Sequence, residues 1–213
     1  KVTGNQIIKA GTLLMLGYTI NEIKDKTNYL NSSTEKIAIK KAIFPWSRFP
    51  AEDTMLGPEM KATGEVLGIG KDFGTALNKA YAAAGVEIGE KEKGVFVTLS
   101  DAEKPNFIEV VNQYVDLDFS IYATEGTASF LKENNIESII VGRADDESPT
   151  SLTIIEEKLI SIVINTPTFA NEYTDGWKIR RLSHETGVAV VSSVREAEAF
   201  LEAFLLQEKV LDD

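Results

Sequence analysis

The second half of this 213-residue chain predicts an α/β fold, a five-stranded parallel sheet of Rossmann type with helices on both faces. Two observations predict it. Five short runs rich in valine and isoleucine alternate with segments of helical period. These runs are apolar throughout, which is typical of strands buried on both faces of a sheet. The expected strands are residues 95–99, 119–123, 138–141, 161–164 and 188–191, and the expected helices are residues 104–115, 127–134, 152–157, 176–185 and 196–206.

The first 93 residues do not continue this alternation, and they predict a smaller α+β segment. The many prolines and glycines between Phe44 and Gly70 indicate long ordered loops. Gly68 and Gly70 resemble part of a dinucleotide fingerprint, but no expected strand ends there, so we discard that motif. The expected regular elements are a helix that Gly17 or Thr19 ends, a strand over residues 36–44 and a helix over residues 72–84, with residues 85–93 as a linker.

Composition excludes several classes of function. The chain has no cysteine, which excludes a disulfide framework, a thiolate nucleophile and a cysteine metal site, and which suits a cytoplasmic protein. No stretch reaches the roughly 20 apolar residues that a membrane span needs. The opening Lys1-Val2-Thr3-Gly4 carries neither Met nor a signal pattern, and we interpret it as a cut end inside a longer protein.

The net charge of -11 is unevenly distributed. Residues 1–93 hold 13 Lys and Arg against 11 Asp and Glu, whereas residues 94–213 hold 9 against 22. This difference indicates two units, with boundaries at 1–90 and 94–213. An acidic second half argues against a nucleic-acid partner, because binding to a phosphate backbone needs clustered cations. The acidity can equally serve solubility alone.

Polar residues follow the expected strands at the edge of the sheet where ligands bind in such folds. Thr124-Glu125-Gly126-Thr127 opens a helix, where backbone N–H groups and two hydroxyls can converge on an anion. Asn165-Thr166-Pro167-Thr168 follows the fourth run. Lys104 and Arg143 can bring positive charge to the same edge, so the set suits a phosphate with a ribose or base alongside. The alternatives are a plain N-cap, a plain turn and a surface lysine.

The sequence contains few residues in a pattern typical of a catalytic or metal-binding site. His184 is the only histidine, and it is expected inside a helix as a partly buried structural residue. The acidic group Asp145-Asp146-Glu147 can hold a cation or a base, but such loops are usually solvated. We therefore expect no catalytic residue and no metal site in this chain.

Two long segments are distinctive: residues 44–50 (FPWSRFP) and 56–68 (LGPEMKATGEVLG). Both resemble a signature of the large subunit of carbamoyl-phosphate synthetase. Shorter matches follow in the same order at Asn165-Thr166-Pro167 and at residues 175–181 (DGWKIRR), and the opening KVTG is also similar. The resemblance spans nearly the whole chain.

The resemblance implies a division of labour within an ATP-dependent ligase of pyrimidine and arginine synthesis. Residues 1–90 would be the tail of its second ATP-grasp unit, and residues 94–213 a methylglyoxal-synthase-like domain that binds UMP, IMP or phosphoribosyl pyrophosphate. The fragment would need no cofactor and would be non-catalytic. The parent enzyme would use ATP, Mg or Mn and K, would bind a glutaminase small subunit, and would be an oligomer without nucleic-acid or membrane partners.

The resemblance also implies roles for individual residues. The effector phosphate would contact Lys104, Thr124, Thr127 and Arg143, and the sugar and base would lie near Asn165, Thr166 and Thr168. These are the residues that the strand-end argument selects. Arg143 replaces the usual Lys, and the loop 145–150 lacks the family's Gly-Arg-Pro-His pattern, which leaves the bound base open.

Three departures bear on ornithine, which activates some family members. Those members have glutamate, an aromatic hydroxyl residue and threonine where this chain has Lys41, Val190 and Ser192. A lysine would repel the ornithine ammonium, so we predict no activation by ornithine. Two alternative functions remain: a structural or oligomerisation domain without ligand, and a methylglyoxal-synthase-type lyase. The lyase would need a Gly-Gly-Asp-like loop and a positioned histidine near the substrate.

Overall fold

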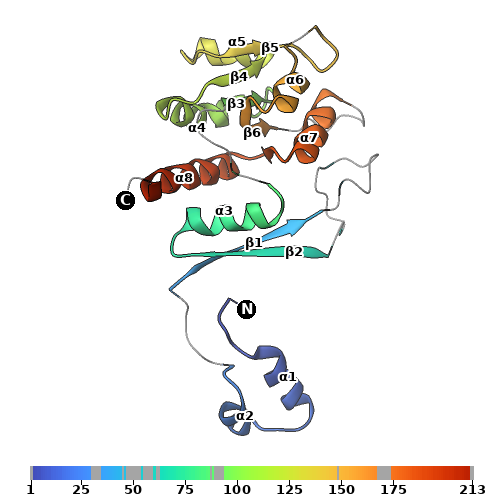
Figure 1. The fold of residues 1–213 in the computed structure, drawn as a ribbon, viewed down its shortest axis with the longest axis vertical. Helices are drawn as coiled ribbons and strands as arrows, with labels where there is room; N and C mark the ends of the chain where they lie inside the picture. The colour runs from blue at the N-terminus through green and yellow to red at the C-terminus, as the bar shows by residue number, and fades with distance from the viewer. Residues whose placement is uncertain are drawn as a thin grey trace.

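The computed structural model describes residues 2–29, 35–44, 46, 54, 60, 63–86, 88, 94–147, 149–166 and 174–211. Figure 1 shows the elements stacked along one long axis, with the parallel sheet at one end, a two-stranded sheet in the middle and a pair of helices at the other end. Within the described part of the chain, no helix is long and apolar enough to cross a membrane.

A five-stranded parallel sheet forms the second half of the chain, as the sequence predicts. Its strands lie in the order β5-β4-β3-β6-β7, and every neighbouring pair is parallel. The chain therefore reverses its direction of winding between β3 and β6, which is where ligands bind in open α/β sheets. The strands are β3 (Gly94–Thr98), β4 (Ile121–Thr124), β5 (Ile139–Val141), β6 (Ile160–Asn165) and β7 (Ala189–Val191).

Helices cover both faces of this sheet and create two separate cores. On one face, Phe107 and Leu131 pack with Phe200 against β3, β4 and β6. On the other face, Ile155 and Ile179 pack against the opposite side chains of the same strands. The first face carries α4 (Lys104–Asp116), α5 (Glu125–Glu133) and α8 (Val194–Leu211), and the second carries α6 (Ser151–Glu156) and α7 (Asp175–Thr186).

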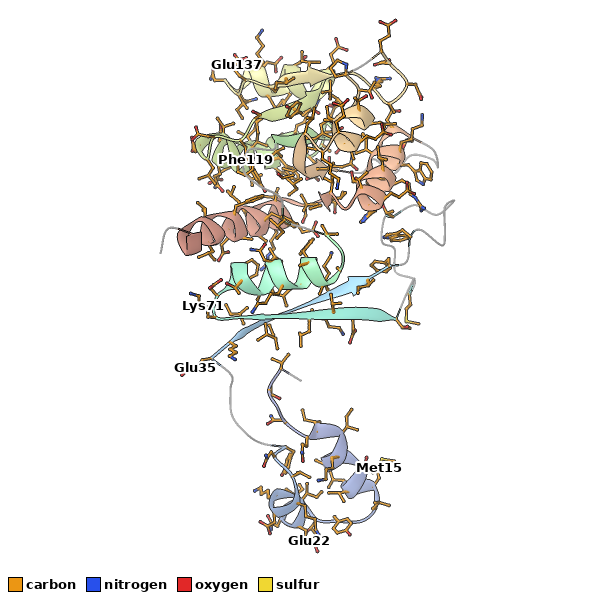
Figure 2. The ribbon with its side chains drawn as sticks, in the orientation of Figure 1. Met15, Glu22, Glu35, Lys71, Phe119 and Glu137 are labelled. Carbon is orange, nitrogen blue, oxygen red and sulfur yellow. The ribbon has the colours of Figure 1, made fainter. Side chains whose placement is uncertain are left out.

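The first half is a separate α+β layer that meets the parallel sheet through α8. Its helix α3 (Phe73–Ala83) packs on α8, and its antiparallel strands β1 (Ile37–Ile43) and β2 (Gly64–Gly70) lie beneath α3 (Figure 1). Tyr81 of α3 meets Phe200 of α8 edge to face, with ring centroids 4.6 Å apart. The helices α1 (Ile7–Met15) and α2 (Ile20–Lys26) complete this half. Figure 2 shows Met15 on this distant pair and Phe119 inside the core of the parallel sheet.

Strand β2 corrects the expectation of loops for residues 64–70, whereas most of residues 45–63 lie outside the described part of the chain. Its glycines are not breakers, because they allow α3 to approach the strand closely. A Cβ on Gly68 would lie 2.0 Å from the Ala76 carbonyl oxygen, and a Cβ on Gly70 would lie 2.6 Å from the Ala76 nitrogen. A strand therefore does end at Gly70, directly before a helix, but it belongs to an antiparallel pair rather than to a parallel βαβ unit.

Helix α2 is a further element that the sequence analysis missed. The first helix was expected to end at Gly17 or Thr19; it ends at Met15, just before Gly17, and Thr19 is the N-cap of α2. Its hydroxyl accepts a hydrogen bond from the Glu22 N–H, and the Glu22 carboxylate accepts one from the Thr19 N–H. In the expected linker, Val86 and Ile88 pack against the core of the parallel sheet. The unit boundaries at 1–90 and 94–213 stay a prediction.

Candidate functional site

A cavity of about 470 Å³ opens at the carboxyl ends of β3, β4 and β5. Four of the predicted site residues line it: Lys104, Thr124, Thr127 and Arg143. They come from α4, from the β4–α5 junction and from the segment after β5, so they are brought together by the parallel arrangement of the strands. Apolar side chains such as Ile140 line the cavity beside these charged and hydroxyl groups, which suits a ligand with a charged end and an organic body.

Thr124 and Thr127 use their hydroxyls differently. The Thr127 side chain is only 2% exposed, and its Oγ1 accepts a hydrogen bond from the Leu99 N–H at 3.1 Å. That bond ties the end of β3 to the first turn of α5. Thr124 is the N-cap residue of α5, yet its side chain makes no capping bond. Among the described residues, its hydroxyl donates to Thr127 Oγ1, at 3.4 Å. Thr124 is therefore not a plain helix cap, and its hydroxyl can turn toward a ligand at the helix N-terminus.

The positive charges at the cavity have unequal surroundings. Lys104 is 14% exposed as a side chain, its Nζ lies 2.6 Å from Asp101 Oδ1, and the same ammonium lies 5.8 Å from the Phe130 ring centroid. The hydrogen bond from Lys104, together with its charge, lowers the pKa of the exposed Asp101 carboxyl. Arg143 is exposed, and its backbone N–H donates to Asp146 Oδ2 at 2.7 Å. An incoming anion must therefore compete with Asp101 for Lys104.

Asn165 and Thr166 line a second cavity of about 270 Å³. Both cavities are lined by Thr98, Leu99, Asp175 and Gly176, so they adjoin each other. Thr166 Oγ1 accepts a hydrogen bond from the Ser100 N–H at 2.7 Å, and Asn165 Oδ1 accepts one from Arg180 Nη1 at 2.8 Å. This second cavity lies where β3 and β6 end side by side, at the reversal of the winding.

Six of the seven predicted site residues thus lie in two adjoining cavities, and Thr168 lies outside the described residues. Sequence reasoning missed two polar side chains. Arg180 is 7% exposed and reaches the second cavity from α7. Ser151 is fully buried at the first cavity, and its hydroxyl has no hydrogen-bond partner among the described residues. The position of Arg180 four residues after Gly176 on one helix face was the available signal for it.

A third cavity, of about 300 Å³, lies between the first segment and the second half. Lys41, Val190 and Ser192, the three departures from the ornithine-activated pattern, all line it. The Lys41 ammonium lies 4.0 Å from the Tyr81 ring centroid, and burial lowers the pKa of that ammonium.

His184 also lines this cavity. Burial, and then the nearby Lys41, Arg181 and Arg180, lower the pKa of His184 to about 4.

The acidic loop after β5 is engaged in local contacts. Both Asp145 carboxylate oxygens accept hydrogen bonds from Lys178 Nζ, at 2.8 and 2.7 Å, and Asp146 accepts the Arg143 N–H. In the part of the chain that the structure describes, no group of three or more His, Asp or Glu side chains has the geometry to hold a metal ion.

Residues 106–192 match the family model of the MGS-like domain. This match covers β4 to β7 and the helices between them, so an MGS-like domain lies within the second half of the chain, where the five-stranded parallel sheet is.

Curated relatives extend the assignment to the whole chain. The carbamoyl phosphate synthase large chain, C-terminal section, of Aquifex aeolicus is 34% identical over 100% of this chain and 42% of that protein. The corresponding section of Methanopyrus kandleri is 37% identical over 98% of this chain and 39% of that protein. The large chain of Lachnoclostridium phytofermentans is 40% identical over 94% of this chain and 19% of that protein.

The chain is therefore homologous, over its full length, to the C-terminal section of the carbamoyl phosphate synthase large chain. It spans between about a fifth and two fifths of the length of these relatives.

Proposed function

We propose that this chain is the regulatory C-terminal part of a carbamoyl phosphate synthase large chain, and that its strand-end cavities bind a nucleotide effector such as UMP. The observation that carries the proposal is the Thr124 hydroxyl, which lies at the α5 N-terminus without a capping bond, in a cavity that Lys104 and Arg143 also line. Helix N-termini with adjacent cations are suited to phosphate.

The division into two cavities supports a nucleotide rather than a simple anion. The first cavity, with its two cations and the N-terminus of α5, would take the phosphate. The second, with the Asn165 amide and the Thr166 side chain, would take the sugar and base. IMP and phosphoribosyl pyrophosphate carry the same phosphate-and-ribose chemistry and are the other candidate effectors.

The activity of the whole enzyme is part of the same proposal. The parent protein would make carbamoyl phosphate with ATP, a divalent cation and potassium, together with a glutaminase small subunit, in the cytoplasm. Residues 1–90 would be the tail of its ATP-grasp unit, and the fragment alone would be non-catalytic. Effector binding would change activity only to the extent that the effector binds one state of the enzyme better than another.

The position of His184 favours a sensor over a methylglyoxal-synthase-type lyase. His184 lines the cavity between the two halves, beside Lys41 and Trp46, and does not line the strand-end cavity where a phosphorylated substrate would bind. Consumption of dihydroxyacetone phosphate by the chain would contradict this. The alternative of a purely structural assembly domain predicts no nucleotide affinity.

Calorimetric titration of the chain with UMP, IMP and phosphoribosyl pyrophosphate tests the proposal. We expect at least one of them to bind, and we expect Thr124→Ala to weaken that ligand about tenfold, which corresponds to about 1.4 kcal/mol, near the lower end of the range for a hydrogen bond to a charged group. Lys132→Ala is the matched control, because Lys132 is an exposed cation in the last turn of α5, at its opposite end. Binding that Thr124→Ala leaves unchanged would place the ligand elsewhere.

A further inference from the structure

Two buried arginines stand next to each other on α7 and contact different halves of the molecule. Arg180 Nη1 donates to Asn165 Oδ1 at 2.8 Å, at the end of β6. Arg181 Nη2 donates to the carbonyl oxygen of Trp46 at 2.9 Å, in the first segment, while its Nε pairs with Glu185 at 2.7 Å. Each arginine is 7% exposed. One helix thus contacts the candidate effector site and the first segment through consecutive residues.

Arg180 itself borders both regions. It lines the second strand-end cavity together with Asn165, and it also lines the cavity between the halves, where Trp46 and His184 lie. The indole of Trp46 and the imidazole of His184 are 6.1 Å apart between ring centroids. A guanidinium is a rigid planar group, so a shift of Arg180 at Asn165 moves the whole group, including the part that lines the cavity where Trp46 lies.

The absence of a side chain at Gly176 leaves space for the guanidinium of Arg180. A Cβ on Gly176 would lie 3.1 Å from Arg180 Nη1, closer than most contacts of a Cβ, and 3.7 Å from Asn165 Nδ2. Gly176 therefore leaves the guanidinium room to reach Asn165 in the first turn of the helix. It also lines both strand-end cavities, so a ligand there would lie next to the Arg180–Asn165 pair.

We propose that Arg180 is a positioning residue that couples occupancy of the strand-end cavities to the contact between α7 and the first segment at Trp46. A ligand that takes up the Asn165 amide changes the hydrogen bond that holds Arg180, and Arg180 carries the change to the cavity beside Trp46. The inference rests on the proposed nucleotide binding, and it names the route by which that binding reaches the other half. Such coupling requires different ligand affinities for the two arrangements of Arg180.

Trp46 supplies a direct readout, because the chain has two tryptophans. In the Trp177→Phe chain, all tryptophan emission comes from Trp46. We expect saturating UMP to change this emission. Adding Arg180→Gln to this chain should abolish the change in Trp46 emission at saturating UMP. Calorimetry should still detect UMP binding, with the affinity reduced by no more than about tenfold, the effect of losing one hydrogen bond. Arg195→Gln, at an exposed arginine in the first turn of α8, is the matched control and should leave the change intact.

Gly176→Ala is a second variant that should fold even if Arg180→Gln does not, because alanine favours the helix more than glycine does. Its methyl group displaces the guanidinium, so it should reduce the Trp46 response at saturation. UMP binding without any change in Trp46 emission would overturn the inference while leaving the proposed function standing. A full response in both variants would overturn it as well. Absence of UMP heat in the unsubstituted chain would reject the proposed function, and this inference with it.

Discussion

Replacing Thr127 by valine tests how the candidate site is built into the fold. Valine keeps the shape of threonine but removes the hydroxyl that accepts the Leu99 N–H at 3.1 Å. Leu99 and Thr127 are both buried at the wall of the first cavity, and valine there offers the Leu99 N–H no acceptor. The substitution therefore leaves a buried donor unsatisfied at the point where β3 meets α5.

The expected cost follows from that lost partner. An unsatisfied buried donor destabilises a protein by about 1–3 kcal/mol. For a chain of this size, each kcal/mol lowers the midpoint of thermal unfolding by about 2–4 °C, so Thr127→Val should lower it by about 2–12 °C. Thr127→Ser retains the acceptor and loses only a buried methyl group, at a cost of about 1 kcal/mol.

Thermal unfolding and amide hydrogen exchange together measure the effect. In Thr127→Val, the Leu99 amide should exchange faster than in the unsubstituted chain, whereas Thr127→Ser should preserve its protection. Thr12→Val is the matched control, since the Thr12 hydroxyl bonds only the Ile8 carbonyl on the exposed helix α1, and it should change stability by less than about 0.5 kcal/mol. Equal stability and equal Leu99 protection in Thr127→Val would refute the reasoning.

Four further outcomes follow from the same geometry. Lys104→Ala should weaken a bound nucleotide by about 1–2 kcal/mol, and titrations at rising salt should show the loss shrinking; a loss independent of salt would contradict a charge contact. Ornithine should give no calorimetric signal, because Lys41 lines the cavity between the halves; binding of ornithine would refute this. Folding lowers the pKa of His184 from 6.5 to about 4, so between these two pH values the unfolded chain binds a proton that the folded chain does not. The free energy of unfolding therefore has its full value above pH 6.5 and falls as pH falls toward 4. Urea unfolding should show a loss of about 2–3 kcal/mol over that interval which His184→Phe lacks, and identical pH profiles would contradict it. Ser151→Ala should leave the urea midpoint unchanged or raise it, because the buried hydroxyl has no partner among the described residues; a fall of more than about 1 kcal/mol would show that the hydroxyl is bonded.

The parallel sheet was predictable because its central strands are buried on both faces, and such strands consist of continuous runs of apolar residues. Strand β2 was not, since its glycines resemble loop residues. Their role becomes visible only when α3 is seen to lie against Gly68 and Gly70. The local sequence cannot distinguish a glycine that permits a turn from one that permits close packing.

The candidate site was predictable to the extent that strand ends share one edge of a parallel sheet. That rule puts Thr124 and Asn165 at the edge where the two strand-end cavities lie, and their role in binding stays a prediction. It does not reveal that the Thr127 hydroxyl already accepts a hydrogen bond from the Leu99 N–H. A substitution at Thr127 therefore changes stability as well as binding, whereas Thr124 makes no capping bond and tests ligand binding more specifically. Nor does it reveal Arg180, whose reach to Asn165 depends on how α7 packs and on the space beside Gly176.

The most direct test of the central claim is a nuclear magnetic resonance titration of the nitrogen-labelled chain with UMP. We expect the largest amide shifts at the strand ends that line the two cavities, in residues 98–101, 124–127, 141–146, 165–166 and 174–176, with the amides of α1 and α2 unchanged. Shifts confined to other surfaces, or none at UMP concentrations well above those of the cell, would contradict a nucleotide sensor at this site.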